Sequence, residues 1–172
     1  MMGPKKWTIP APKVSLVVKM ADMLASNEQN AQLVTYSLGS CVGISVYDPV
    51  VKVGGLLHAL LPDSSINLER ARGNPFTFVD TGLPALFHAV YALGGVKWRL
   101  IVKLAGGAEV FEGNKLFGIG RRNIEAAESI LCRNGVVVQG RDVGGKEIRT
   151  FRMEMASGNV TLDISGKGTR VL

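Results

Sequence analysis

Cys41 and His58 are the residues of this chain whose types and spacing most suggest chemistry. The chain has only two cysteines and two histidines. Cys41 follows the pair Gly39-Ser40 and directly precedes a strand-like run, whereas His58 lies inside the apolar run 53–62. Because a thiolate and an imidazole can act as a nucleophile and its base, these residues predict cysteine chemistry if the fold brings them together.

The Gly39-Ser40 turn offers a way to activate the cysteine. A cysteine attacks as its thiolate, so a catalytic cysteine needs neighbours that lower its pKa. Backbone N–H groups exposed by a tight turn favour the thiolate, and they can also hold an oxyanion during acyl transfer. With an imidazolium nearby as well, we expect the Cys41 thiol to ionise below the usual cysteine pKa of about 8.5.

Both residues also have ordinary structural interpretations. A cysteine on a strand is most often buried and inert, and this alternative stays open for Cys41. A single histidine among leucines is more often a hydrogen-bonded core residue than a base, and this alternative stays open for His58.

Thr35 is a candidate third member of the site. If residues 38–40 form a turn, the strands on either side pair as a hairpin and place Thr35 diagonally across from Cys41, at roughly 7–8 Å between the origins of the two side chains. An imidazole fits into that gap. A histidine from the next strand, 53–60, could then contact the thiol on one side and the threonine on the other, as in a nucleophile–base–orienter triad.

Hydrophobic periodicity and turn residues predict a single α+β domain over residues 14–165, preceded by a flexible leader at 1–13 and followed by a frayed tail at 166–172. Three successive strands between residues 33 and 60 predict a meander, and two helices are expected on one face of antiparallel-rich sheets. The expected strands lie at 14–19, 33–38, 42–47, 53–60, 98–104, 136–141, 148–155 and 159–164, and the expected helices at about 80–93 and 120–133.

Composition limits the partners and the compartment. A net charge of +6 favours acidic partners, but Lys and Arg are scattered, so we expect no nucleic-acid binding. Lys19 and Asp22 interrupt the apolar segment near the N-terminus, which predicts no membrane insertion and a cytoplasmic location. Two distant cysteines are too few for a zinc site or a disulfide framework.

A glycine motif, two glutamates and the second cysteine have ordinary structural interpretations. The segment 118–123 resembles the beginning of a dinucleotide-binding G-x-G-x-x-G motif but lacks its third glycine. Glu109 and Glu112 are expected to be solvated loop charges, and Cys132 a packing residue of the second helix.

Several motifs follow one another in a fixed order over residues 14–165. They are Thr35-Tyr36-Ser37-Leu38-Gly39-Ser40-Cys41-Val42, Tyr47-Asp48-Pro49, 54–64 (GGLLHALLPDS), Phe78-Val79-Asp80-Thr81, Lys103-Leu104-Ala105-Gly106-Gly107-Ala108, Ile119-Gly120-Arg121-Arg122-Asn123 and Asp142-Val143-Gly144-Gly145. Taken together, this order of motifs resembles the chemoreceptor glutamine deamidase family CheD.

The resemblance implies a Cys-His-Thr triad, which falls on Cys41, His58 and Thr35. It also implies a layered α/β/β fold and a reaction that converts glutamine side chains of methyl-accepting chemotaxis receptors to glutamate, with release of ammonia through a thioester. Gly39 and Ser40 would supply oxyanion contacts, and neither a metal nor an organic cofactor is required.

A second role of a different class stays open. Members of the family are also known to associate with receptors and with a CheC-type phosphatase, so the chain could act as a non-catalytic chemotaxis adaptor. The cytoplasmic helices of the receptors are the expected partner in either role, because such signalling helices are rich in acidic residues and the chain is basic.

Overall fold

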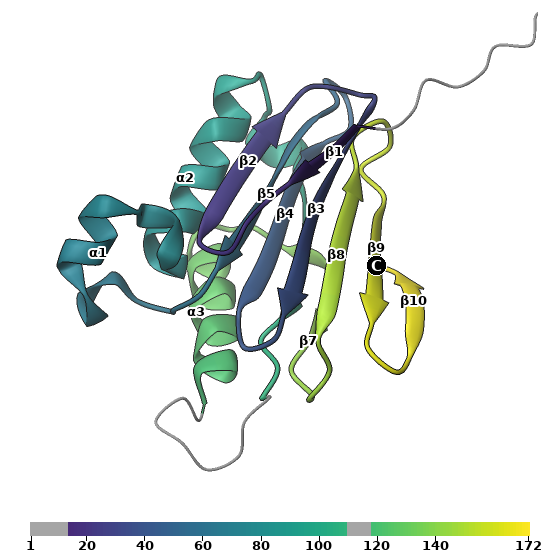
Figure 1. Cartoon of the computed structure of the whole chain (residues 1–172). Helices are drawn as coiled ribbons and strands as arrows, with labels where there is room; N and C mark the ends of the chain where they lie inside the picture. Colours follow the sequence, from purple (N-terminus) through teal and green to yellow (C-terminus); the bar gives the residue numbers. More distant parts are fainter. Residues whose placement is uncertain (1–13, 110–117) are drawn as a thin grey trace, which may run out of the picture.

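Two five-stranded sheets and a layer of helices form the fold (Figure 1). The computed structural model describes residues 14–109 and 118–172, so the predicted leader at 1–13 lies outside the described residues. The outer sheet has the order β1-β3-β8-β9-β10, with β1 (Val14–Val17), β3 (Ala31–Leu38), β8 (Arg149–Glu154), β9 (Val160–Ile164) and β10 (Gly168–Val171). The central sheet has the order β2-β5-β4-β6-β7, with β2 (Asp22–Ser26), β5 (Val53–Ala59), β4 (Val42–Asp48), β6 (Ile101–Gly106) and β7 (Val138–Val143).

Two helices cover the face of the central sheet that lies away from the outer sheet (Figure 1). They are α2 (Val79–Ala92) and α3 (Ile119–Arg133); a short helix, α1 (Leu68–Gly73), and the single turns η1 (Ser64–Ile66), η2 (Pro75–Thr77) and η3 (Lys97–Arg99) lie in the connections. The layers are therefore helices, central sheet and outer sheet. This confirms the predicted α+β sandwich with two main helices on one face.

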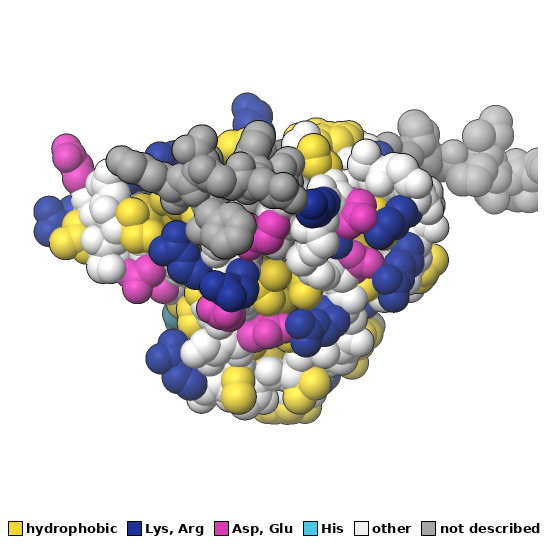
Figure 2. Space-filling view, turned by 90° about the horizontal axis from the view of Figure 1, so that it is seen from below, with side chains coloured by type: hydrophobic (Ala, Val, Ile, Leu, Met, Phe, Trp, Pro, Cys, Tyr) yellow, Lys and Arg dark blue, Asp and Glu magenta, His cyan; other side chains and the backbone are white. Residues whose placement is uncertain are grey.

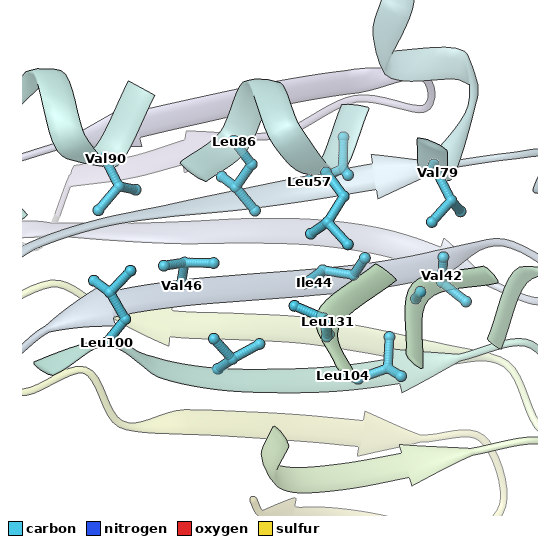
Figure 3. Packing of buried hydrophobic residues seen from close by; sticks show 14 of the residues in the cluster. Val42, Ile44, Val46, Leu57, Val79, Leu86, Val90, Leu100, Leu104 and Leu131 are labelled. Atoms are coloured by element: carbon cyan, nitrogen blue, oxygen red, sulfur yellow. The ribbon is translucent and has the colours of Figure 1, made fainter. Parts of the chain in front are cut away.

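Both strands at the middle of the central sheet are buried along their whole length. On β4, Val42, Ile44 and Val46 point toward the helices (Figure 3). On β5, Leu56 instead belongs to the cluster between the two sheets. Side chains alternate along a strand, so His58 also faces the outer sheet. Burial on both faces explains why the sequence around His58 is a continuous apolar run rather than an alternating one.

The predicted meander is wrong at its first connection. β4 and β5 do form an antiparallel hairpin, but β3 pairs with β1 and β8 in the outer sheet and not with β4. Between Leu38 and Val42 the chain crosses from one sheet to the other. The alternation of apolar residues within a strand does not specify which sheet the strand joins, so the Gly39-Ser40 turn was mistaken for a hairpin turn.

The two predicted helices are confirmed within one or two residues. In α2 the predicted stripe of Leu83, Leu86 and Val90 is buried, whereas Leu93 lies just past the helix end and is partly exposed. α3 ends at Arg133 with Asn134 as its C-cap, and Gly135 takes the left-handed conformation (φ 66°) that favours glycine there. Within the described residues, no helix is long and apolar enough to cross a membrane.

Three strands differ from the prediction, and two of them, β2 and β10, lie at sheet edges. β2 was not predicted; all of its residues are only half-buried, which leaves a weak pattern. The predicted frayed tail is wrong for residues 168–171, because β10 pairs with β9 through its backbone although its side chains are exposed. The strand predicted from Trp98 begins only at Ile101, and Trp98 itself is 85% exposed on η3.

Candidate functional site

His58 and Thr35 are in direct contact across the two sheets. Thr35 on β3 is fully buried and His58 on β5 is 2% exposed. The Oγ1 atom of Thr35 lies 2.7 Å from Nδ1 of His58. The contact that the sequence predicted between these residues is present, but it forms because two sheets pack face to face and not because β3 and β4 form a hairpin.

A backbone carbonyl fixes the direction of this hydrogen bond. The Thr35 hydroxyl also lies 2.7 Å from the carbonyl oxygen of Val18, which can only accept a hydrogen bond. The single hydroxyl proton therefore goes to Val18, and Thr35 Oγ1 accepts the proton of His58 Nδ1. This network assigns the Nδ1–H tautomer to His58 and leaves Nε2 with a free lone pair.

His58 Nε2 is itself unusual. It is buried and has no hydrogen-bond partner within the described part of the chain. Buried polar atoms are nearly always hydrogen-bonded, so an unpartnered one calls for a specific explanation. A ring nitrogen that carries a lone pair and has no partner is able to take a proton from a neighbouring group.

Cys41 lies next to His58 through the register of β4 and β5. His58 is the antiparallel partner of Gly43. Cys41 lies just before β4 and packs against the cluster between the two sheets, the side that His58 faces. If the strand alternation is continued from Gly43, Cys41 is a diagonal neighbour of His58, a relation that typically places Cα atoms roughly 7–8 Å apart. Gly43 has no side chain, and the Leu38 side chain takes the space there: a Cβ on Gly43 would lie 2.7 Å from Cδ1 of Leu38. The Cys41 side chain is partly exposed.

Three consecutive carbonyl groups of the crossing between the sheets are held by hydrogen bonds; residues 39–41 are called the cysteine loop below. The Gly39 oxygen accepts from the N–H of Ala108 (2.7 Å), and the Cys41 oxygen accepts from the N–H of Gly107 (2.7 Å). The Ser40 oxygen accepts from the side-chain amide of Asn123 (2.8 Å). The backbone of the cysteine loop is therefore held in place by hydrogen bonds from the segment after β6 and from α3.

Gly106 shows how tightly the cysteine loop is packed. Its φ of 102° is in the region that favours glycine, and a Cβ there would lie 2.3 Å from the Cys41 oxygen. A side chain at this position would displace the candidate nucleophile. This explains the glycine at position 106, the last residue of β6, whose role the sequence alone did not reveal.

The site keeps both candidate reactive groups neutral at rest. Burial raises the pKa of the Cys41 thiol above its ordinary value, an effect opposed by a smaller one from the backbone amide of Cys41. Burial lowers the pKa of His58 to about 4. The predicted depression of the thiol pKa by an imidazolium is therefore wrong, because near pH 7 His58 is neutral. A proton must move from sulfur to nitrogen during attack rather than before it.

The predicted oxyanion contacts differ between the two turn residues. The Gly39 N–H already donates to the Ser37 carbonyl at 2.9 Å, which removes it as a free donor. The N–H of Ser40 is the one left as a candidate. The same segment contains a β-bulge between Thr35 and Leu38, where Ser37 adopts a φ of 58°. Such irregularities next to a site re-aim neighbouring side chains.

Three minor predictions can also be compared with the structure. Glu109 accepts hydrogen bonds from the N–H groups of Gly118 and Arg121 at 3.1 Å each, so it caps α3 and is not a purely solvated charge. Glu112 lies outside the described residues. Cys132 is exposed and is not a packing residue. The glycine of the G-x-G segment, Gly120, serves close packing, since a Cβ there would lie 2.4 Å from the Gly107 oxygen.

No other centre competes with this constellation in the residues that the structure describes. They contain no group of three or more Cys, His, Asp or Glu side chains placed to hold a metal ion. A cavity of about 330 Å³ between α2 and α3 is lined mainly by apolar side chains, with contributions from His88 and Tyr91, and neither Cys41 nor His58 reaches it.

The end of the molecule where β3 ends and β4 begins points downward in Figure 1 and faces the viewer in Figure 2. Lys and Arg side chains alternate there with Asp and Glu around a small apolar area (Figure 2). Arg149, opposite Leu38 in the register, forms a buried ion pair with Asp142 at 2.7 Å. Among the residues that the structure describes, this face therefore carries charges of both signs and no continuous basic stripe.

Comparison with known proteins decides the family. Residues 60–164 match the family model described as CheD chemotactic sensory transduction. The chain is 45% identical over 157 residues to the "Probable chemoreceptor glutamine deamidase CheD 1" of Syntrophus aciditrophicus, covering 91% of this chain and 98% of the relative. The chain belongs to the CheD family. The CheD relative of Pyrococcus horikoshii, also named a probable chemoreceptor glutamine deamidase, is 44% identical over 140 residues, which cover 80% of this chain and 85% of the relative.

The family match bears on the site in a limited way. The matched region begins at Leu60, so Thr35, Cys41 and His58 lie outside it. The alignment with the CheD relative of Solibacter usitatus, 43% identical over 152 residues, covers 88% of this chain and 90% of the relative. Membership in the CheD family thus follows from the comparisons, whereas the roles of the three residues depend on the geometry.

Proposed function

We propose that this CheD protein is a cysteine-dependent deamidase that converts glutamine side chains of chemoreceptors to glutamate. The names of its relatives support the substrate class. The observation that carries the proposal is the chain of contacts from the Val18 carbonyl through Thr35 to His58, which leaves Nε2 as an unpartnered proton acceptor on the face that Cys41 shares.

The first half of the reaction forms a thioester. The Cys41 sulfur attacks the carboxamide carbon while His58 Nε2 takes the thiol proton, and the carbonyl oxygen becomes an oxyanion. The Ser40 N–H is the donor offered to this oxyanion. The imidazolium then gives its proton to the nitrogen of the tetrahedral intermediate, the C–N bond breaks and ammonia leaves.

The second half restores the enzyme. His58 Nε2 takes a proton from water as the water oxygen attacks the thioester carbon. The C–S bond breaks, the proton returns to sulfur, and the substrate leaves as a glutamate side chain. The new carboxyl group gives its proton to ammonia through the solvent, so the net change is glutamine plus water to glutamate plus ammonium, with no oxidant and no net proton held by the protein.

Thr35 supports this cycle as a neutral orienter. It holds the imidazole through Nδ1 and adds no negative charge. A carboxylate in its place would stabilise the imidazolium and raise the pKa of His58. The neutral hydroxyl fits a pKa of about 4, at which the imidazolium is a strong enough acid to protonate the departing nitrogen readily.

The substrate is expected to be a glutamine on a cytoplasmic receptor helix. A helix presents its side chains from a rigid rod, so only glutamines with small neighbours such as Ala, Ser or Gly should reach Cys41. A CheC-type phosphatase remains a second proposed partner, and no membrane or nucleic-acid partner is proposed.

The test is peptide mapping by mass spectrometry of a receptor cytoplasmic fragment after incubation with the protein, together with ammonia release. The wild type should convert a few glutamines with small neighbours, Cys41→Ala should convert none, and Cys132→Ala should match the wild type. Tight binding of the fragment by wild type and Cys41→Ala, with no mass change in either case, would contradict catalysis and favour the adaptor role.

A further inference from the structure

Asn123 at the start of α3 joins the two segments that carry Cys41 and His58. Its side chain has no exposed surface. Its amide nitrogen lies 2.8 Å from the Ser40 oxygen and 2.9 Å from the Leu60 oxygen. Ser40 directly precedes Cys41, and Leu60 follows His58 by two residues. One amide group therefore bridges the cysteine loop and the strand that carries the imidazole.

The chemistry of the two contacts fixes the orientation of the amide. Both partners are carbonyl oxygens, which only accept hydrogen bonds, so the NH₂ group must face them. Both of its protons are used, while Oδ1 is buried with no partner in the described part of the chain. This position thus requires a side chain that donates two hydrogen bonds, and not only one of the right size. An aspartate of the same size would bring a negative oxygen against two carbonyls.

The turn of α3 around Asn123 also supports the other contacts of the cysteine loop. A Cβ at Gly120 would lie 2.4 Å from the Gly107 oxygen and 2.7 Å from the Ala108 oxygen. Gly107 and Ala108 donate the hydrogen bonds that hold the carbonyls of Cys41 and Gly39. The first turn of α3 therefore rests on the segment that holds the cysteine loop from its other side.

We propose that Asn123 is a positioning residue that sets the distance between the Cys41 sulfur and His58 Nε2. It touches neither reacting atom and acts through Ser40 and Leu60. The inference rests on the proposed pairing of Cys41 with His58. It predicts a large effect from a small movement, because a misplacement of about 1 Å can cost on the order of 100-fold in rate.

A double-mutant cycle on thiol reactivity tests this role without a receptor substrate. In a Cys132→Ser background, iodoacetamide can label Cys41 alone. His58→Ala should slow this labelling at pH 7 in the protein with Asn123, because the base is lost. In the Asn123→Ala background the same change should alter the rate less than about twofold, because the base is already out of place.

A second measurement separates positioning from general loss of stability. Asn123→Ala should lower kcat for deamidation at least about tenfold with KM little changed, since substrate contacts remain. Leu131→Ala, a buried change two turns further along α3, should reduce the thermal midpoint at least as much and keep kcat. Asn123→Ser, which retains one donor, should lie between Asn123→Ala and the wild type and provides a milder variant if Asn123→Ala does not fold.

The pH dependence of Asn123→Asp gives a third readout. A protonated carboxyl can donate one of the two hydrogen bonds, whereas a carboxylate can donate neither. The activity of Asn123→Asp relative to Asn123→Ala should therefore rise as the pH falls. A ratio that does not vary with pH would contradict the requirement for a donor.

The outcomes distinguish the two proposals. An equal effect of His58→Ala on labelling in both Asn123 backgrounds, or a kcat of Asn123→Ala within twofold of the wild type, would overturn the positioning role. Absence of ammonia release by the wild type, with the His58 effect present and lost on Asn123→Ala, would overturn the proposed function and leave the positioning role standing.

Discussion

The two ends of β4 both bury polar groups but treat them in opposite ways. At the far end, Asp48 is fully buried, and its carboxylate accepts hydrogen bonds from the N–H groups of Val50, Val51 and Val96 and from Arg99. These bonds lower the pKa of Asp48 although burial alone would raise it. Near Cys41, by contrast, His58 Nε2 and Asn123 Oδ1 have no partner in the described residues.

The difference separates a stabilising end from the end that carries the candidate reactive groups. Fully satisfied buried groups hold the β4–β5 turn to the loop before β6 and leave nothing available for chemistry. Unsatisfied groups cost folding free energy and persist where they can meet a ligand. Thr77 Oγ1 is the third buried atom without a partner in the described part of the chain, and the Thr77 carbonyl accepts from Leu60, close to Asn123. All three atoms therefore belong to residues within the segment 58–61 or hydrogen-bonded to its backbone, at the cysteine end of the molecule.

The largest expected effect comes from removing the reactive groups themselves. Cys41→Ala should reduce deamidation to the uncatalysed level, and His58→Ala should lower it about 100- to 10,000-fold, because general acid–base catalysis contributes this much. Both variants should remain folded by circular dichroism. Ammonia release by Cys41→Ala near the wild-type rate would show that the nucleophile is another residue.

Asp48→Ala should reduce stability and leave activity unchanged, the converse of the effect expected for Cys41→Ala and His58→Ala. It leaves several buried N–H groups and Arg99 without their carboxylate, so the free energy of unfolding should fall by about 3 kcal/mol. Denaturant unfolding measures this loss. Deamidation by the folded fraction should be unchanged, because Asp48 and Cys41 lie at opposite ends of the strand. A loss of kcat comparable to the loss in His58→Ala would show that the two ends are coupled.

The buried imidazole should make the cysteine end sensitive to acid. The pKa of His58 is lowered from 6.5 to about 4 by burial, so the folded state binds fewer protons than the unfolded state between these values. The resulting stability is fully present above pH 6.5 and is lost as the pH falls toward 4. Between pH 7.5 and 4.5 the wild type should lose about 2–3 kcal/mol more than His58→Gln in denaturant unfolding.

The His58→Gln comparison removes the contribution of the carboxylates, which both proteins share. A parallel loss of stability in the two proteins would mean that His58 titrates near its ordinary pKa. In that case burial would not lower the pKa of His58, and its imidazolium would be a weaker acid toward the departing nitrogen than the proposed mechanism requires.

The sequence pointed to the candidate site residues more clearly than to the path of the chain that brings Thr35 and His58 together. Cys41 and His58 stood out because Cys and His are rare in this chain, and the helices were readable from stripes such as Leu83, Leu86 and Val90. The contact of Thr35 with His58, however, was derived from a hairpin that does not exist. The alternation of apolar residues shows which side chains of a strand face the core, but it does not show which sheet the strand joins. The packing of two sheets against each other could therefore not be predicted from it.

Asn123 was missed for a related reason. It sits one helical turn before Ala127 on the buried face of α3, and a polar residue in such an apolar stripe is a readable signal. Its partners are the carbonyls of Ser40 and Leu60, however. Every residue has a backbone carbonyl, so the sequence does not show which of them accept a side-chain hydrogen bond. The Val18 carbonyl, which fixes the tautomer of His58, was hidden for the same reason.

The smallest expected effect is also the sharpest test of the contrast between the two ends, because it concerns a single hydrogen bond. Thr35→Val keeps the shape but leaves His58 Nδ1–H without its acceptor, at a cost of about 1–3 kcal/mol. Deamidation should therefore fall about 10- to 100-fold. Thr35→Ser keeps the hydroxyl and should retain most activity. The matched pair separates the hydrogen bond from the packing, since Val fills the site and Ser does not.

A nitrogen NMR spectrum of the histidine ring decides whether Thr35 acts through the tautomer. In the wild type, Nδ1 of His58 should carry the proton and Nε2 should not, because the Val18 carbonyl takes the hydroxyl proton of Thr35. Thr35→Ser should give the same tautomer. Thr35→Val should give a mixture, because nothing then favours either nitrogen. If the wild type carried the proton on Nε2, this unpartnered nitrogen could not accept the thiol proton, and the proposed direction of proton transfer would be wrong.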